Sequence, residues 1–103
     1  MPDPNAVILA EVANSGVVQM PYRQFPGVVI QGDTLSHLFD SLRESLSASR
    51  AARTESAYYP ALEVAMHIQG LLHEYESALS KAGKALPYAT PVEERQVHDQ
   101  FAA

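Results

Sequence analysis

Several residue types that support common kinds of protein chemistry are missing or scarce in this chain. Cysteine is absent, which excludes disulfide bonds, thiolate nucleophiles, zinc–thiolate sites and iron–sulfur clusters. Tryptophan is absent too, and seven Lys and Arg residues stand against twelve Asp and Glu residues, for a formal net charge of −5. Because an acidic chain repels phosphate backbones, this composition disfavours nucleic-acid binding and suits a basic partner surface.

Long apolar runs are also missing. No stretch approaches the roughly 20 apolar residues that a membrane-spanning helix needs. The first five residues lack a basic segment, and the apolar run Ala6–Ala10 is too short for the core of a signal peptide. We therefore expect a cytoplasmic protein without a membrane partner, and the lack of cysteine agrees with that location.

What is present is an ordinary globular composition. The 103 residues are 47% apolar and 18% charged, and domains most often contain about 100–150 residues. We predict one α+β domain, in which a three-stranded antiparallel sheet is packed by two main helices and a short C-terminal helix follows. The predicted bounds are a single domain over 1–103, a β-sheet over 6–31, a helix over 34–49, a long helix over 60–86 and a tail over 87–103.

Three strands are predicted in the first third of the chain. The apolar runs Ala6–Ala13 and Val17–Met20 flank Asn14-Ser15-Gly16, whose residues suit a tight turn, so we expect a β-hairpin. Gly27–Gln31 is rich in β-branched residues and predicts the third strand. We expect Phe25, just before it, to cap the core of the sheet rather than to bind a partner.

Two helices follow from the spacing of apolar residues. Leucine and phenylalanine recur from Leu35 to Leu46 at steps of three and four residues, with Asp33 or Thr34 as the N-cap. A heptad-like seam then runs from Pro60, expected as the first helical residue, to about residue 86. That helix ends through a Gly83 cap or because of Pro87.

The C-terminal tail carries a signature of its own. Thr90-Pro91-Val92-Glu93 places a hydroxyl, a proline and a carboxylate at the spacing of a capping box. This predicts a short third helix that reaches about Gln100.

A resemblance narrows the functional class. The segment from Phe25 to Leu35 reads FPGVVIQGDTL and continues through Leu38, Leu42 and Leu46. This stretch, with the preceding hairpin, resembles the HicB-like antitoxin family over roughly residues 6–48. It is also similar to small uncharacterised bacterial proteins that share an FPGVVIQGD core. The resemblance implies a small antiparallel sheet with a helix on one face, in a protein that binds and blocks a toxin. Many family members add a fourth strand and then a DNA-binding segment. Here a long helix follows, and neither a helix-turn-helix nor a basic tail is visible, so operator binding is not implied.

Motifs of catalysis and of metal or cofactor binding are not recognisable in the sequence. His67 and His73 are six residues apart and point in different directions around a helix, and no HExxH pattern occurs. His37 with Asp40 is read as an exposed pair rather than a metal site. No GxSxG elbow and no Gly-rich phosphate loop is found. We therefore expect no enzyme activity, no cofactor and no metal.

A protein partner is the remaining expectation. Tyrosines are enriched at interfaces, so Tyr58 and Tyr59 are candidate anchors, although one ring could equally pack on the sheet while the other stays half exposed. Acidic side chains would give electrostatic complementarity to the partner. The predicted partner-binding residues are Asp40, Glu44, Tyr58, Tyr59, Glu63, Glu74 and Glu76.

Two functions follow from this expectation. The first is an immunity protein or antitoxin that neutralises a cognate toxin or effector by stoichiometric binding. The alternative is a non-toxin adaptor or regulatory homodimer that acts through the long helix.

Overall fold

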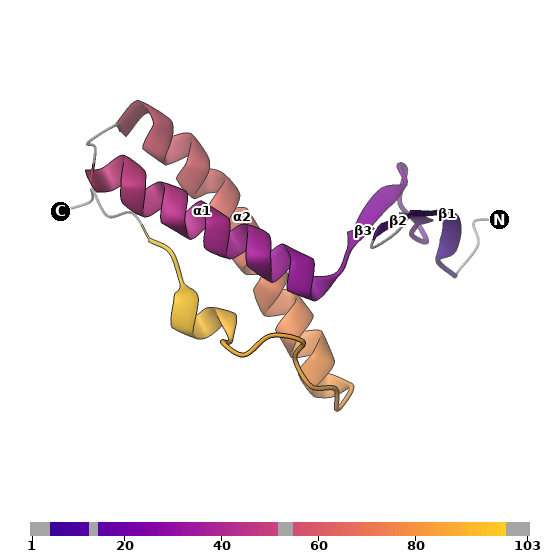
Figure 1. Cartoon of the computed structure of the whole chain (residues 1–103). Helices are drawn as coiled ribbons and strands as arrows, with labels where there is room; N and C mark the ends of the chain where they lie inside the picture. The colour runs from indigo at the N-terminus through magenta and orange to yellow at the C-terminus, as the bar shows by residue number, and fades with distance from the viewer. Residues whose placement is uncertain (1–4, 13–14, 52–54, 99–103) are drawn as a thin grey trace. The chain divides into compact units, whose positions relative to one another are not determined.

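The computed structural model describes residues 5–12, 15–51 and 55–98. Contacts within the chain define two compact units, which we call the sheet unit (residues 1–31) and the helical unit (residues 32–103). The elements are β1 (Val7–Val12), β2 (Ser15–Gln19), β3 (Gly27–Ile30), α1 (Gly32–Ala51), α2 (Glu55–Lys81) and the 3₁₀ helix η1 (Val92–Arg95) (Figure 1). The predicted α+β class, with three antiparallel strands, two main helices and a short C-terminal helix, is confirmed. Whether the two units form a single domain stays a prediction.

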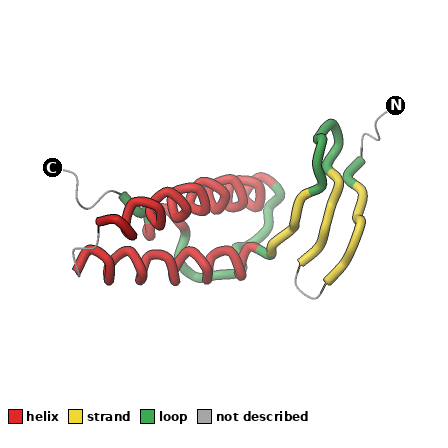
Figure 2. Tube along the Cα trace, turned by 90° about the horizontal axis from the view of Figure 1, so that it is seen from above, coloured by secondary structure: helices red, strands yellow, loops and turns green. Residues whose placement is uncertain are grey.

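The sheet unit is a meander in which β2 lies between β1 and β3 (Figure 2). Both pairs are antiparallel, and the β1–β2 register shifts between Ile8 and Ala10. Ser15 and Gly16 belong to β2, which corrects their assignment to the turn: Ser15 pairs with Val12, so any turn lies between those two residues, outside the described residues. Within this unit, no described side chain is buried.

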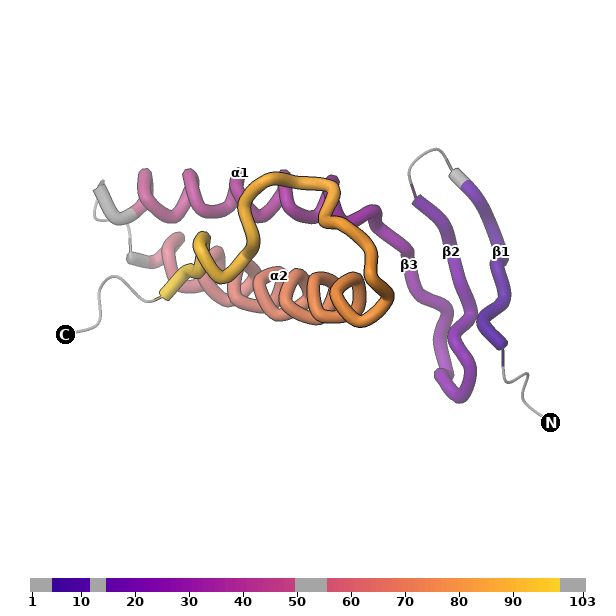
Figure 3. The backbone as a smooth tube through the Cα atoms, turned by 90° about the horizontal axis from the view of Figure 1, so that it is seen from below, coloured from indigo at the N-terminus to yellow at the C-terminus, as the bar shows by residue number. Residues whose placement is uncertain are grey.

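The two main helices of the helical unit run antiparallel and pack along their length (Figure 3). The helix α1 begins at Gly32, before both predicted N-caps, and Asp33 Oδ1 accepts a bond from the Thr34 N–H at 2.9 Å. Gly32 is buried, and a Cβ atom there would overlap the ring of Tyr75. The close approach of α1 to α2 at this point therefore requires glycine.

The bounds predicted for the long helix were wrong at both ends. Pro60 is not the first residue but lies inside α2, where its missing N–H removes one helical hydrogen bond near the start of the helix. At the other end, Gly83 has a φ of 69°, and the Lys84 N–H donates to the Leu79 carbonyl at 2.9 Å. This left-handed glycine ends the helix, so the Gly83 alternative is the correct one.

The C-terminal segment (residues 87–98) returns along the helical hairpin (Figure 3). It contains η1, which is shorter than predicted because Gln96 is already extended, and positions 99 and 100 lie outside the described residues. The capping-box prediction was wrong. Pro91 rather than Thr90 occupies the N-cap, no side chain of η1 caps it, and Glu76 of α2 accepts the Val92 N–H instead, at 2.9 Å.

The core of the helical unit has two clusters. The first contains Leu46, Tyr58, Leu62 and Ala65, and the second contains Phe39, Leu72 and Val92. Val97 packs against both clusters. The C-terminal segment therefore completes the core, and it joins the two clusters.

None of the helices in the described parts of the chain combines the length and the apolar character that a membrane crossing requires.

Candidate functional site

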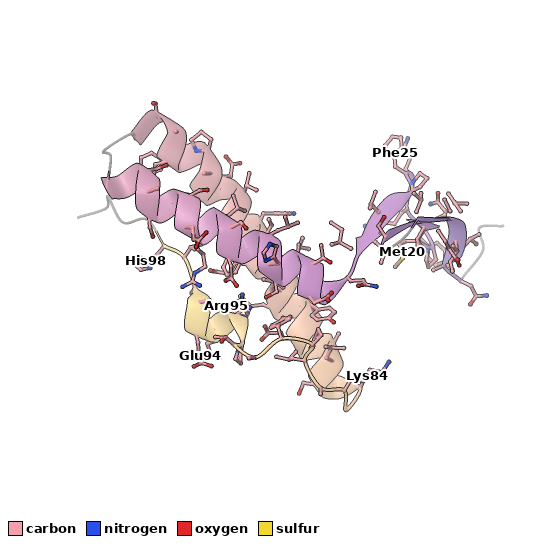
Figure 4. All side chains as sticks on the ribbon, viewed as in Figure 1. Met20, Phe25, Lys84, Glu94, Arg95 and His98 are labelled. Carbon is pink, nitrogen blue, oxygen red and sulfur yellow. The ribbon has the colours of Figure 1, made fainter. Side chains whose placement is uncertain are left out.

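The β2–β3 loop, which we define as residues 20–26, presents large apolar side chains to solvent. Tyr22 is 77% exposed and Phe25 is 73% exposed, and Met20 is also exposed. Figure 4 labels Met20 and Phe25 in this part of the sheet unit. The expectation that Phe25 caps a core is wrong within this unit, because the three-stranded sheet does not enclose the ring.

This loop holds one residue in an unusual conformation. The Arg23 N–H donates to the Met20 carbonyl at 3.4 Å and closes a turn, and Gln19 Nε2 donates to the Met20 and Arg23 carbonyls at 3.2 and 2.7 Å. Tyr22, the third residue of the turn, has a φ of 62°. Glycine is the residue normally found at such a position, so a solvent-exposed tyrosine there is kept against a conformational cost.

Apolar side chains also lie on both faces of the sheet. Residues that pair directly across an antiparallel sheet share a face. Val28 pairs with Val17, and Ile30 lies two residues further on the same face, whereas Val29 and Ile8 lie on the opposite face. All but Val17 of these side chains are exposed in the sheet unit. Strands that are apolar on both faces are typical of a sheet that is covered on both sides.

The two predicted tyrosine anchors are in different environments. Tyr58 is 0% exposed, packs with Leu46 and Leu62, and donates from its hydroxyl to the His98 carbonyl at 3.2 Å. Its assignment as a partner anchor is therefore wrong, because the ring fills the core. Tyr59 is partly exposed, at 43%, and meets the Tyr58 ring edge to face, with centroids 5.3 Å apart. The half-exposed ring agrees with the alternative prediction, but that prediction placed the other ring on the sheet, whereas Tyr58 lies in a core cluster of the helical unit.

Two of the predicted partner-binding acids hold the helical unit together. Glu76 Oε2 accepts a bond from the Tyr88 hydroxyl at 2.7 Å, besides the bond from the Val92 N–H. Asp40 Oδ1 accepts bonds from Arg95 Nη1 at 3.0 Å and from Arg43 Nη1 at 3.3 Å. These carboxylates fix the C-terminal segment to the two helices, which gives each of them a structural role that the sequence did not indicate.

The other predicted acids, Glu44, Glu63 and Glu74, are exposed on the helices. Their role in partner binding, like that of Tyr59, stays a prediction. In the ranges that the structure describes, no group of three or more His, Asp or Glu side chains is arranged to hold a metal ion.

Tyr88 joins the C-terminal segment to α2 by more than its hydroxyl. Its ring stacks on Tyr75, with centroids 6.5 Å apart. Burial raises the pKa of the Tyr88 phenol well above its usual value, and the hydrogen bond and the charge of Glu76 raise it further. The phenol is therefore held as a donor to Glu76 over the physiological pH range.

An open groove of about 1020 Å³ lies on the helical unit, and α1, the C-terminal segment and Tyr58 of α2 provide its walls. Arg95 lines this groove, and Figure 4 labels it beside Glu94 on the C-terminal segment. Its side chain is only 7% exposed. No sequence signal singles out Arg95, since its pairing with Asp40 joins residues far apart in the chain.

The fold and these surfaces define a small α+β protein with an apolar loop and an apolar sheet. A family model described as "Family of unknown function (DUF6959)" matches residues 1–88, so the chain belongs to this family. The match includes the β2–β3 loop and both main helices and ends before η1. No curated protein and no solved structure matches the chain.

Proposed function

We propose that this chain is a non-enzymatic protein-binding module whose β2–β3 loop and sheet dock onto a partner protein. The observation that carries the proposal is the exposure of Met20, Tyr22 and Phe25 on one loop, with Tyr22 at a positive φ. Met, Tyr and Phe are enriched at protein interfaces, and rigid aromatic anchors dominate binding energies. Backbone strain of this kind is concentrated at functional sites.

The proposed partner is a cognate toxin or effector, which the module neutralises by stoichiometric binding in the cytoplasm, as an immunity protein or antitoxin. The resemblance of residues 6–48 to HicB-like antitoxins supports this class of partner. The net charge of −5 supports a basic partner surface. The exposed acids Glu44, Glu63 and Glu74 would steer the encounter, and the association rate would then fall as salt is added.

The test is co-expression with the protein encoded beside this chain's gene, with growth of the host as the readout. Wild-type chain is expected to restore growth and to form a complex of fixed stoichiometry with that protein on size-exclusion chromatography. The double variant Tyr22→Ser with Phe25→Ser should lose both properties while its circular dichroism spectrum is unchanged.

Val64→Ser is the matched control, because Val64 is an exposed apolar residue that belongs to α2 in the helical unit and not to the loop. It should restore growth as wild type does. Restoration by the Tyr22→Ser/Phe25→Ser variant, or neutralisation at far less than one equivalent of the chain, would contradict the proposal.

A homodimer built through α2 is the second candidate function. Val64 and Leu71 are exposed and lie seven residues apart on this helix, so the two side chains share one face. An exposed apolar pair at heptad spacing is what a second helix would pack against. Sedimentation equilibrium of the purified chain distinguishes the two functions. A dimer that Val64→Asp dissociates favours the homodimer, and a monomer at all concentrations excludes it.

A further inference from the structure

Arg95 is the most completely enclosed charged side chain among the described residues. Its guanidinium lies 5.5 Å from the centroid of the Phe39 ring and 5.2 Å from that of the Tyr88 ring. Its Nη1 donates to Asp40 Oδ1 at 3.0 Å. Two aromatic contacts and one charged hydrogen bond therefore fix the orientation of the guanidinium plane.

Two donors of this side chain are not used. The Nε and Nη2 atoms are buried, and neither has a hydrogen-bond partner in the described part of the chain. No other buried side-chain nitrogen or oxygen there lacks a partner. Buried polar groups in native proteins are nearly always paired, and unpaired donors on a charged group are especially unfavourable.

The two unused donors form a matched pair. In an arginine, the N–H bonds of Nε and Nη2 lie on the same edge of the guanidinium and point in nearly the same direction. This fork fits the two oxygens of a carboxylate, or two oxygens of a phosphate, with two parallel hydrogen bonds. The bond to Asp40 uses Nη1, so it does not involve this edge, which has no hydrogen-bond partner among the described residues.

The charges around the groove favour one of these ligands. The groove is lined by the carboxylates of Asp40, Glu44 and Glu94 and by the guanidiniums of Arg43 and Arg95. A dianionic phosphate would meet a surplus of negative charge, whereas a singly charged carboxylate meets less repulsion. We propose that Arg95 is the anchor of a carboxylate-binding site, in which Nε and Nη2 hold a monocarboxylate that enters from this groove.

Binding requires a local movement, because both unused nitrogens are buried. We expect the end of the C-terminal segment (residues 96–98) to move, while the bonds of Glu76 to Tyr88 and Val92 keep the rest of the segment in place. In the described part of the chain, this end is held to α2 by the bond from the Val97 N–H to Gln69 Oε1 at 2.6 Å and by the bond from the Tyr58 hydroxyl to the His98 carbonyl. The site shares no residue with the β2–β3 loop, so the proposed function and this site can be tested by separate variants.

The test is a titration of the ¹⁵N-labelled full chain with sodium acetate, with sodium chloride at equal ionic strength as the reference. The Nε–Hε cross-peak of Arg95 is followed by NMR, and it is assigned by through-bond experiments in the wild-type chain. We expect this peak to shift with acetate and not with chloride. We also expect the Tm to rise by about 4–8 °C at an acetate concentration of about five times the Kd.

Two variants test whether the paired Nε and Nη2 donors of Arg95 cause the response to acetate. Arg95→Lys keeps the charge but removes the paired donors, so the rise in Tm with acetate should vanish. Arg43→Lys is the matched control, because Arg43 also bonds Asp40 and lines the groove, but its side chain is 40% exposed where that of Arg95 is 7% exposed. It should keep the full acetate response. If Arg95→Lys does not fold, the NMR shift in the wild-type chain still tests the site.

The source of the carboxylate is resolved by a further pair of probes. A short alanine peptide with a free C-terminal carboxylate is compared with the same peptide as a C-terminal amide. A response to the free acid that exceeds the response to acetate indicates a peptide carboxylate, and an equal response indicates a small free acid. Three results would overturn the site: an Arg95 peak that acetate does not move, a response to inorganic phosphate without one to acetate, or an unchanged acetate response in Arg95→Lys.

Discussion

Phe25 and Phe39 are the same side chain in the two units of this molecule, and they have opposite environments. Phe39 is 0% exposed in the helical unit, where Leu72 and Val92 surround it, whereas Phe25 is mostly exposed in the sheet unit. The helical unit buries apolar side chains from three separate segments, and the sheet unit buries none of its described ones. The difference indicates that the helical unit has a core of its own, while the sheet unit is suited to being completed by another surface.

The largest expected effect comes from making the same substitution in both units. Phe39→Ala should lower the free energy of unfolding by about 3–5 kcal/mol, because it removes a fully buried ring and leaves a cavity. Phe25→Ala should change it by less than about 0.5 kcal/mol, as for other exposed positions. Urea denaturation followed by circular dichroism measures both. Equal losses for the two variants would mean that the sheet unit also has a buried core.

Two glycines allow a second paired comparison. Gly32→Ala forces a methyl group against the Tyr75 ring and should cost about 1–3 kcal/mol of stability. Gly27→Ala, at the start of β3, meets nothing within 4 Å and should change stability by less than about 0.5 kcal/mol. The same denaturation experiment applies. A Gly32→Ala variant as stable as wild type would show that α1 and α2 do not approach so closely at this point.

The hydrogen bond between Tyr88 and Glu76, which attaches the C-terminal segment, should make the free energy of unfolding depend on pH. Burial, and then the hydrogen bond to Glu76, raise the pKa of the Tyr88 phenol above its ordinary value of 10.0. A raised pKa in the folded state means that this stabilisation is complete below about pH 10 and is lost as the pH rises toward the raised value.

Tyr88→Phe should therefore cost about 1 kcal/mol at neutral pH, through the lost hydrogen bond. Between about pH 9 and about pH 11, the variant should lose less stability than the wild-type chain does. Urea denaturation across this range measures the difference. Parallel pH profiles for the two chains would show that Tyr88 has the same pKa in the folded and unfolded states.

The smallest expected effect is an increase in the stability of the sheet unit. Tyr22→Gly relieves the positive φ of the turn and should stabilise the strands by about 0.5–1 kcal/mol. The same substitution removes a proposed anchor, so complex formation with the partner should weaken. Hydrogen exchange of the strand amides measures the first effect, and titration calorimetry with the partner measures the second. A variant that binds the partner as tightly as wild type would show that the tyrosine at this turn does not serve binding.

The sequence was sufficient for the parts of the fold that rest on local periodicity. The stripe that begins at Leu35 predicted α1 and its buried residues Phe39 and Leu46, and the three strands were found close to their observed bounds. The start of α2 was misplaced because proline near the beginning of a helix costs only one hydrogen bond, which tertiary packing around Tyr58 offsets.

The features that carry the candidate sites could not be predicted, because they depend on residues distant in sequence. Glu76 caps η1 from another helix, and Arg95 reaches Asp40 across 55 positions of the chain. The positive φ of Tyr22 has no sequence signal, since tyrosine is not a residue that such a turn favours. Phe25 was predicted to lie in a core because large apolar side chains usually do. That prediction fails because the described part of the sheet unit has no second layer that could cover the ring.

The central claim is that the sheet unit lacks a core of its own and is completed by a partner protein. Native-state hydrogen exchange of the purified chain, resolved by residue and repeated at two concentrations, tests it most directly. We predict that amides in β1–β3 are protected at least about 100-fold less than those in the middle of α1 and α2, at both concentrations. Strand amides that are protected as strongly as the helical amides at both concentrations, without any partner, would contradict the claim.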